Sequence, residues 1–150
     1  MKILSFNCRG LASSHKKLSL KWLVDCTKLD VILLQETLGD RDVIKVTLEI
    51  LLPGWEFEAL DARGRSGGLA MGWRSRIFNC VNLFGFDFGL GVIRFSEEFG
   101  KIMTVINIYG PYLNRVVYWN DLLSKSIIKD NWVVMVLIFN EDGYQGQVIP

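Results

Sequence analysis

The sequence is poor in several residue types that often build functional sites. It contains three cysteines, three prolines and a single histidine among 150 residues. The cysteines, Cys8, Cys26 and Cys80, are far apart in the sequence, which argues against a zinc site of paired cysteines. Their odd number favours free thiols over a disulfide framework. The single histidine, His15, cannot form a two-histidine metal site, and its Ser and Lys neighbours predict a surface position.

Long apolar runs are also missing, although half of the residues are hydrophobic. The longest apolar stretch, 133–139 together with Trp132 before it, has eight residues, whereas a membrane-spanning helix needs about 18 or more. The N-terminal sequence MKILSF is followed by Asn7 and Arg9, so it lacks the extended apolar region of a signal peptide. We therefore expect no membrane segment and an intracellular chain.

A strong excess of charge of one sign is absent too. Seventeen Lys and Arg face sixteen Asp and Glu, which leaves a formal net charge of +1 and no global field that would attract nucleic acid. A local exception is the segment 63–76, which has four arginines and no acidic residue. Within it Arg65 and Arg74 are candidate phosphate ligands, because guanidinium groups bind phosphate through paired donors. A solvated hairpin with charged ends explains the same segment equally well.

What the sequence does contain is an alternation of short apolar runs and amphipathic stretches, which predicts an α/β fold in layers. Expected helices cover 13–28, 40–52 and 114–126. Expected strands cover 2–6, 31–34, 55–59, 69–73, 77–83, 92–96, 102–109 and 132–139.

The apolar residues of the expected helices indicate which side faces the core. In the first helix the spacing favours Leu18, Trp22, Leu23 and Cys26, and in the second it favours Val43, Ile44, Leu48 and Leu51. In the third helix the corresponding residues are Val117, Trp119, Leu122 and Leu123. We expect Trp22, Trp119 and Trp132 to be core residues rather than surfaces for stacking.

Polar side chains lie at the ends of several expected strands. Asn7, Gln35 with Glu36, and Asn140 end expected strands, and Asn107 and Tyr109 lie on the long strand 102–109. Polar groups at adjacent strand ends meet at one edge of a layered α/β fold, where ligands usually bind. Carboxylate and amide oxygens suit a hard cation such as Mg²⁺. The alternative is that these residues only mark where strands reach solvent, and for each residue taken separately that alternative is the simpler one.

Five segments in order resemble a known family. They are KILSFNCRGL at 2–11, DVILLQET at 30–37, GRSGGLAMGW at 64–73, INIYGP at 106–111 and WVVMVLIFN at 132–140. Together they resemble the endonuclease/exonuclease/phosphatase superfamily with the DNase-I-like fold. The nearest resemblance is to the endonuclease domain of plant LINE-type (non-LTR) retrotransposons.

The resemblance implies a fold and an activity. The fold is an α/β sandwich of two mixed β-sheets packed face to face with outer helices. The activity is Mg²⁺-dependent hydrolysis of phosphodiester bonds in nucleic acid, DNA rather than RNA, with a nuclear location if the retroelement origin holds. Glu36 would be the principal metal ligand and Asn7 would lie beside it. Tyr109 would bind the scissile phosphate, and Asn140 would orient the attacking water or the phosphate.

Two departures from the family pattern leave two hypotheses open. Where the family has G-G-D-F-N, residues 136–140 of this sequence read V-L-I-F-N. Ile138 therefore stands where the resemblance places the general-base aspartate. The later S-D-H segment of the family is not found. We therefore expect residues 1–150 to form an incomplete domain whose second sheet is incomplete and which self-associates through its uncovered sheet. The chain is either an impaired nuclease with a weak magnesium site, or an inactive remnant that binds nucleic acid or protein weakly.

Overall fold

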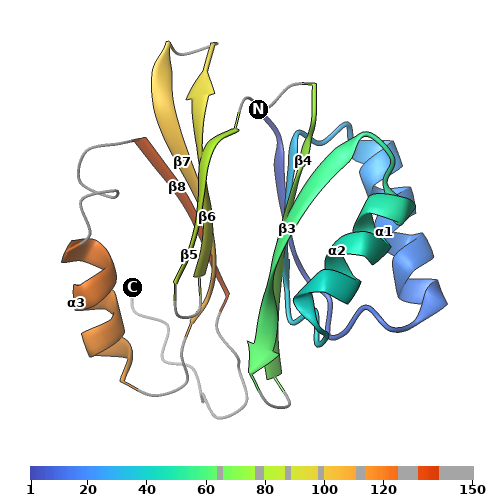
Figure 1. The fold of residues 1–150 in the computed structure, drawn as a ribbon, viewed down its shortest axis with the longest axis horizontal. Helices are drawn as coiled ribbons and strands as arrows, with labels where there is room; N and C mark the ends of the chain where they lie inside the picture. The colour runs from blue at the N-terminus through green and yellow to red at the C-terminus, as the bar shows by residue number, and fades with distance from the viewer. Residues whose placement is uncertain are drawn as a thin grey trace, which may run out of the picture.

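The structure is a computed structural model that describes residues 1–63, 66–76, 80–86, 89–97, 100–110, 114–124 and 132–138. Two four-stranded sheets pack face to face in the middle of the molecule, and the helices lie outside them (Figure 1). This arrangement confirms the predicted α/β sandwich of two mixed sheets with outer helices.

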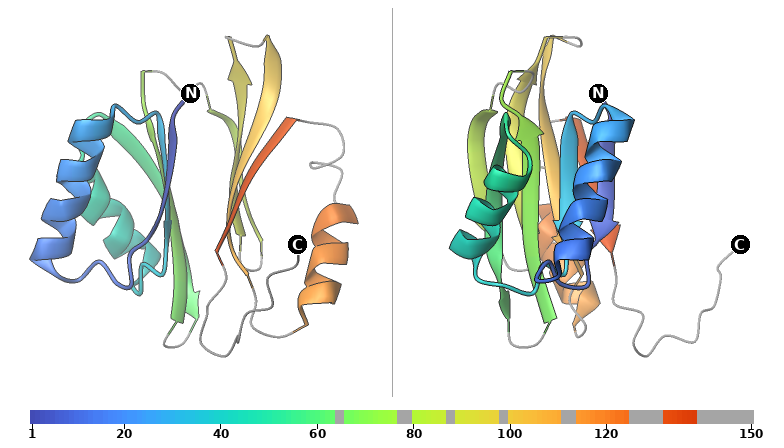
Figure 2. Two further views of the ribbon diagram at one scale, coloured as in Figure 1. Left: turned by 180° about the vertical axis from the view of Figure 1, so that it is seen from behind. Right: turned by 90° about the vertical axis from the view of Figure 1, so that its right-hand side faces the viewer.

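The first sheet has the strand order β1-β2-β4-β3. Its strands are β1 (Ile3–Asn7), β2 (Val31–Gln35), β4 (Ser66–Arg74) and β3 (Trp55–Arg63). β1 runs parallel to β2, whereas β4 is antiparallel to both β2 and β3. Helices α1 (Ser14–Thr27) and α2 (Arg41–Leu51) cover the outer face of this sheet (Figure 2).

The second sheet has the strand order β5-β6-β7-β8. Its strands are β5 (Cys80–Phe86), β6 (Gly89–Ser96), β7 (Lys101–Tyr109) and β8 (Trp132–Ile138). The pairs β5–β6 and β6–β7 are antiparallel, and β7–β8 is parallel. Helix α3 (Arg115–Ser124) lies between β7 and β8 in the chain and stands on the outer side of this sheet (Figure 1).

Three apolar clusters hold these layers together. One lies between the two sheets and includes Val31, Leu33, Met71, Val92 and Val105. The second lies between the first sheet and its helices, and the third lies beneath α3 around Ile106, Ile108 and Leu122. All five residues of β2 are buried, because β2 is an inner strand with apolar layers on both faces.

Helix α1 corrects one prediction. Leu18 and Trp22 are 63% and 68% exposed, and Cys26 is also exposed, whereas Leu20 and Val24 are only 1% exposed. Apolar residues occur on both faces of this helix, so its periodicity did not identify the buried face. Trp22 is therefore not a core residue. Trp119 is partly buried against the cluster under α3, and the side chain of Trp132 lies outside the described residues.

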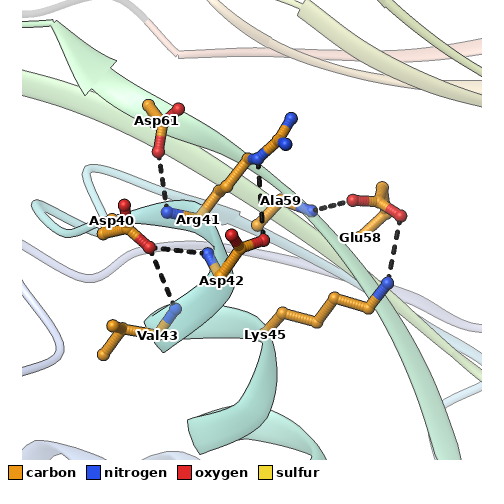
Figure 3. Close-up of polar contacts among 8 residues, drawn as sticks. All are labelled: Asp40, Arg41, Asp42, Val43, Lys45, Glu58, Ala59 and Asp61. Atoms are coloured by element: carbon orange, nitrogen blue, oxygen red, sulfur yellow. Dashed lines mark hydrogen bonds and ion pairs between the residues drawn. The ribbon is translucent and has the colours of Figure 1, made fainter.

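Helix α2 begins where Asp40 predicts it. An oxygen of the Asp40 carboxylate accepts hydrogen bonds from the backbone N–H groups of Asp42 and Val43, at 2.9 and 3.2 Å (Figure 3). This is the usual pattern of an N-cap, which satisfies amides that have no partner inside the helix. Ile44 and Leu48 are buried as expected, but Val43 is exposed, so the buried stripe is narrower than predicted.

Two further contacts tie α2 to β3. The backbone N–H of Arg41 donates to the Asp61 carboxylate at 2.7 Å, and Lys45 Nζ lies 3.3 Å from Glu58 Oε2 (Figure 3). Both contacts are on the outer side of the first sheet. They place the helix on the sheet without involving any predicted site residue.

Other predictions concern the surface. In α3, Val117 and Leu123 are exposed, so only part of the expected apolar side of this helix is buried. Among the described residues no helix is long and apolar enough to cross a membrane.

Phe95 and Ile102 pair across β6 and β7 and are both exposed, 42% and 46%. Self-association of the chain remains a prediction.

Candidate active site

The C-terminal ends of β1 and β2 lie side by side because these strands are parallel. Asn7 at the end of β1 pairs with Gln35 at the end of β2. The contact continues beyond the strands: the Cys8 amide donates to the Gln35 carbonyl at 2.8 Å, and the Gly10 amide donates to the Glu36 carbonyl at 2.7 Å. The structure therefore brings Asn7 and Glu36 to the same edge of the sandwich, here called the site edge.

Tyr109 reaches the site edge from the other sheet. Its hydroxyl donates a hydrogen bond to Glu36 Oε1 at 2.8 Å. Tyr109 is buried and Glu36 is half-buried, so the contact is partly shielded from water. A hydrogen bond to a carboxylate is stronger than one between neutral groups. This contact joins the ends of β2 and β7, and it places two predicted site residues within one cluster.

A buried polar network beneath this contact aligns the two sheets. Asn107 is fully buried on β7, and its Nδ2 donates to the carbonyls of Leu34 and Ala70 in the first sheet, both at 3.0 Å. Its Oδ1 accepts from Gln35 Nε2 at 2.5 Å. Residues two apart on a strand share a face. The hydrogen bonds of Asn107 therefore fix the position of β7 along the first sheet, and with it the position at which Tyr109 contacts Glu36.

The sequence pattern groups Gln35, at the end of its strand, and Asn107, on the long strand 102–109, with the polar residues expected at a ligand-binding edge. Instead both are completely buried between the sheets, and Gln35 also exchanges hydrogen bonds with Ser5. An amide in an otherwise apolar strand needs buried partners. That requirement was visible in the sequence, but the identity of the partners was not.

Glu36 has an unusual backbone conformation. Its φ is +53°, and Leu38 two residues later has the same value. Residues other than glycine adopt positive φ rarely and at an energetic cost, and such residues tend to cluster at functional sites. The chain therefore turns sharply after β2, and the turn determines where the Glu36 carboxylate lies.

The loop after β1 is held by local contacts. Asn7 Oδ1 accepts a hydrogen bond from the Arg9 amide at 3.1 Å. Lys16 from α1 donates through Nζ to the Cys8 carbonyl at 3.1 Å and also to the Arg9 carbonyl. These contacts bring a cation near the site edge.

Cys8 itself is buried beside this edge. Burial raises the pKa of its thiol to about 12, with the Lys16 charge opposing and the Glu36 charge reinforcing the shift. Because the thiolate is the nucleophilic form, Cys8 is not a candidate nucleophile. Its influence on the site is as a neutral packing residue.

The remaining predicted site residues either lie outside the described residues or lie away from the site edge. Ile138 pairs with Tyr109 on the neighbouring strand, so the backbone of β8 also ends at the site edge, but its side chain is outside the described set. Asn140 and Arg65 lie outside the described residues. Arg74 lies at the other end of β4, where its Nε donates to the Leu29 carbonyl at 2.7 Å and its guanidinium stacks 5.1 Å from the Trp55 ring.

Arg74 is therefore not brought to the site edge. In the register of the first sheet, Trp73 pairs with Val31, at the start of β2, whereas Glu36 follows its end. The length of the strand separates Arg74 from Glu36. We do not include Arg74 in the candidate site.

The donor set at the site edge suits a hard cation. Glu36 offers a carboxylate and Asn7 an amide oxygen, and Mg²⁺ is often held by one or two carboxylates together with waters and substrate phosphates. Within the described ranges, no three His, Cys, Asp or Glu side chains gather as a metal site. The residues present thus fit a magnesium ion that depends on water and substrate for most of its ligands.

Comparisons with known proteins agree with the fold. The model of the Endonuclease/Exonuclease/phosphatase family matches residues 4–136. No curated protein sequence matches the chain. The solved structure of an endonuclease/exonuclease/phosphatase from Bacteroides vulgatus superposes with a TM-score of 0.69 at 16% identity, covering 92% of this chain and 65% of that one.

Two further structures have the same fold. The APE2 catalytic domain of Xenopus laevis has a TM-score of 0.67 at 20% identity, covering 91% of this chain and 57% of that one. The endonuclease domain of TRAS1, a telomere-specific non-LTR retrotransposon, has a TM-score of 0.62 at 11% identity, covering 90% and 57%. This chain spans less than two thirds of the length of each of these structures. The two sheets, the site edge and the matched segment together establish that the chain belongs to the endonuclease/exonuclease/phosphatase family.

Proposed function

We propose that the site edge is a magnesium-dependent phosphodiesterase site that acts on nucleic acid, DNA in preference to RNA. The observation that carries this proposal is the hydrogen bond from the Tyr109 hydroxyl to Glu36 Oε1, at 2.8 Å, between the ends of β7 and β2. It supports the proposal because it joins two residues that the family resemblance assigns to the metal and to the phosphate.

The residues have separate roles in this proposal. Glu36 and Asn7 hold the cation, which when bound would polarise a phosphoryl oxygen and neutralise part of the phosphate charge. The Tyr109 hydroxyl has one hydrogen, and in this structure it donates that hydrogen in a hydrogen bond to Glu36 Oε1. A phosphate oxygen that enters the site can accept that hydrogen bond instead, so Tyr109 would position the phosphate diester next to Glu36. The role of Asn140, which is to orient water or phosphate, follows from the resemblance alone.

Hydrolysis by this chain is expected to be slow. Ile138 is paired with Tyr109 at the end of β8, and an alkyl side chain cannot accept a proton from water. General-base catalysis contributes roughly 10²- to 10⁴-fold to a rate. We therefore propose that the chain retains at most residual phosphodiesterase activity.

A nicking assay on supercoiled plasmid DNA in Mg²⁺ tests the proposal. We expect at most slow nicking, which Glu36→Gln and chelation by EDTA both abolish. The matched control is Glu49→Gln, because Glu49 is an exposed glutamate on α2, away from the site edge. Fast nicking, or nicking that Glu36→Gln leaves unchanged, would contradict this assignment of the site.

Binding without turnover is the second candidate function. Ile138 favours it, because loss of the base slows chemistry without removing the groups that bind phosphate. Fluorescence anisotropy with a labelled DNA duplex in Mg²⁺ distinguishes the two candidates. Binding that weakens in Glu36→Gln, with no cleavage over many hours, would favour a binding module over an enzyme.

A further inference from the structure

Unusual backbone conformations are concentrated around Glu36. Ten described residues have a positive φ, and six of them lie in three segments that meet at the site edge. These six are Arg9 (45°), Gly10 (89°), Glu36 (53°), Leu38 (53°), Gly67 (87°) and Gly68 (80°). Glycine adopts positive φ without strain, but in Arg9, Glu36 and Leu38 this conformation is strained and persists only where the surroundings hold it in place.

The three segments are joined by backbone hydrogen bonds on both sides of Glu36. The Glu36 carbonyl accepts from the Gly10 amide at 2.7 Å. On the other side, the amides of the next two residues donate to the start of β4: Thr37 to the Gly68 carbonyl at 3.2 Å, and Leu38 to the Gly67 carbonyl at 3.3 Å. Glu36 is thus held between the loop after β1 and the glycine pair of β4.

The Thr37 side chain packs directly against Gly68. Its side chain is 1% exposed, and its hydroxyl has no hydrogen-bond partner in the part of the chain that the structure describes. A Cβ atom on Gly68 would lie 2.5 Å from Thr37 Oγ1, 3.3 Å from the Leu38 amide nitrogen and 3.4 Å from Ala62 Cβ. The first distance is shorter than any ordinary contact. A side chain at position 68 would therefore push the segment that follows Glu36 out of its place.

We propose that Gly68 and Thr37 are positioning residues for Glu36. The glycine allows the 37–38 backbone to lie against β4, and the Thr37 side chain fills the remaining space. Together they hold Glu36 at positive φ, with its carboxylate against the Tyr109 hydroxyl. This inference rests on the proposed function, because it assigns a purpose to the position of the Glu36 carboxylate.

The test compares Gly68→Ala with Gly54→Ala. Gly54 also has a positive φ, +82°, but nothing lies within 4 Å of a Cβ built there, so that variant introduces backbone strain without a collision. Two quantities are measured: the ring signals of Tyr109 in the NMR spectrum of tyrosine-labelled protein, and the affinity for Mn²⁺ alone. Tyr109→Phe assigns the signal, and Glu36→Gln shows its position when the carboxylate is lost.

Both alanine variants should lower the melting temperature, and only Gly68→Ala should affect the site. We expect it to move the Tyr109 signal toward its position in Glu36→Gln and to weaken Mn²⁺ binding by roughly 10- to 100-fold, as the loss of groups that orient a metal ligand usually does. Adding Thr37→Ala to Gly68→Ala should partly restore the Tyr109 signal and the affinity for Mn²⁺, because it removes Thr37 Oγ1, the atom with which the new methyl group collides. An unchanged Tyr109 signal in Gly68→Ala, or an equal change in Gly54→Ala, would overturn the inference.

A second variant covers the case in which Gly68→Ala does not fold. Thr37→Ala leaves the glycines intact and only empties the space above them, and Thr47→Ala on α2 is its matched control. We expect Thr37→Ala to shift the Tyr109 signal and Thr47→Ala to leave it unchanged; equal spectra for the two variants would refute the role of Thr37. If wild-type protein binds no Mn²⁺, the proposed metal role of Glu36 fails, while the Tyr109 signal still decides the positioning role.

Discussion

Replacing Asn107 with alanine should loosen the two sheets and separate Tyr109 from Glu36. The Asn107 side chain makes three hydrogen bonds to the first sheet: two donated to the Leu34 and Ala70 carbonyls, and one accepted from Gln35. A buried hydrogen bond of this kind contributes about 0.5–1.5 kcal/mol net, so the loss of three should lower the free energy of unfolding by about 2–4 kcal/mol.

Urea denaturation monitored by tryptophan fluorescence measures this loss. Asn120→Ala is the control, because Asn120 is exposed on α3 and its replacement should change the free energy of unfolding by no more than about 0.5 kcal/mol. A double-mutant cycle with Gln35→Ala should show coupling between the two side chains, since they contact each other. A loss below about 1 kcal/mol in Asn107→Ala would refute the structural role given to this network.

Three further predictions follow from burial. Iodoacetamide at pH 8 should modify exposed Cys26 and leave Cys8 unmodified in the folded protein, because the raised pKa of Cys8 keeps it protonated; peptide mass mapping measures this. For the same reason stability should fall as pH rises from about 9 toward about 12, where the unfolded thiol ionises and the buried one does not, and Cys8→Ala should remove that part of the pH dependence. Leu20→Ala should cost about 2–5 kcal/mol of stability, whereas Trp22→Ala should cost less than about 1 kcal/mol, since only Leu20 is buried; equal losses in urea denaturation would contradict the orientation of α1.

The elements of the fold could be predicted from the sequence because most strands are apolar runs with clear ends. The segment 31–35 is a buried strand in the structure, and Asp40 begins the second helix, as local pattern and capping chemistry predict. Helix α1 is an exception, because its buried face does not follow from the spacing of its apolar residues. Leu18 and Trp22 have the same spacing as a core stripe, so only the packing against the sheet shows that Leu20 and Val24 form the buried face.

The candidate site could be predicted only in part, for a similar reason. Asn7 and Glu36 end adjacent parallel strands, which the strand pattern suggests. The contact between Tyr109 and Glu36 spans 73 residues and two sheets, so it depends on how the sheets align. That alignment is set by Asn107 and its buried partners, and no local pattern reveals which carbonyls a buried amide will meet. The position of Arg74 could not be predicted either. The register between β2 and β4 places Arg74 at the end of β4 that is far from Glu36, and no local pattern reveals that register.

Binding of Mg²⁺ by the wild-type chain and by Glu36→Gln, measured by isothermal titration calorimetry, tests the central claim most directly. The claim is that Glu36 at the site edge is the main protein ligand of a weakly held cation. It predicts weak binding by the wild-type chain, no detectable binding by Glu36→Gln, and unchanged binding by Glu49→Gln. Tight binding that survives Glu36→Gln would contradict it, and so would the absence of any binding by the wild-type chain.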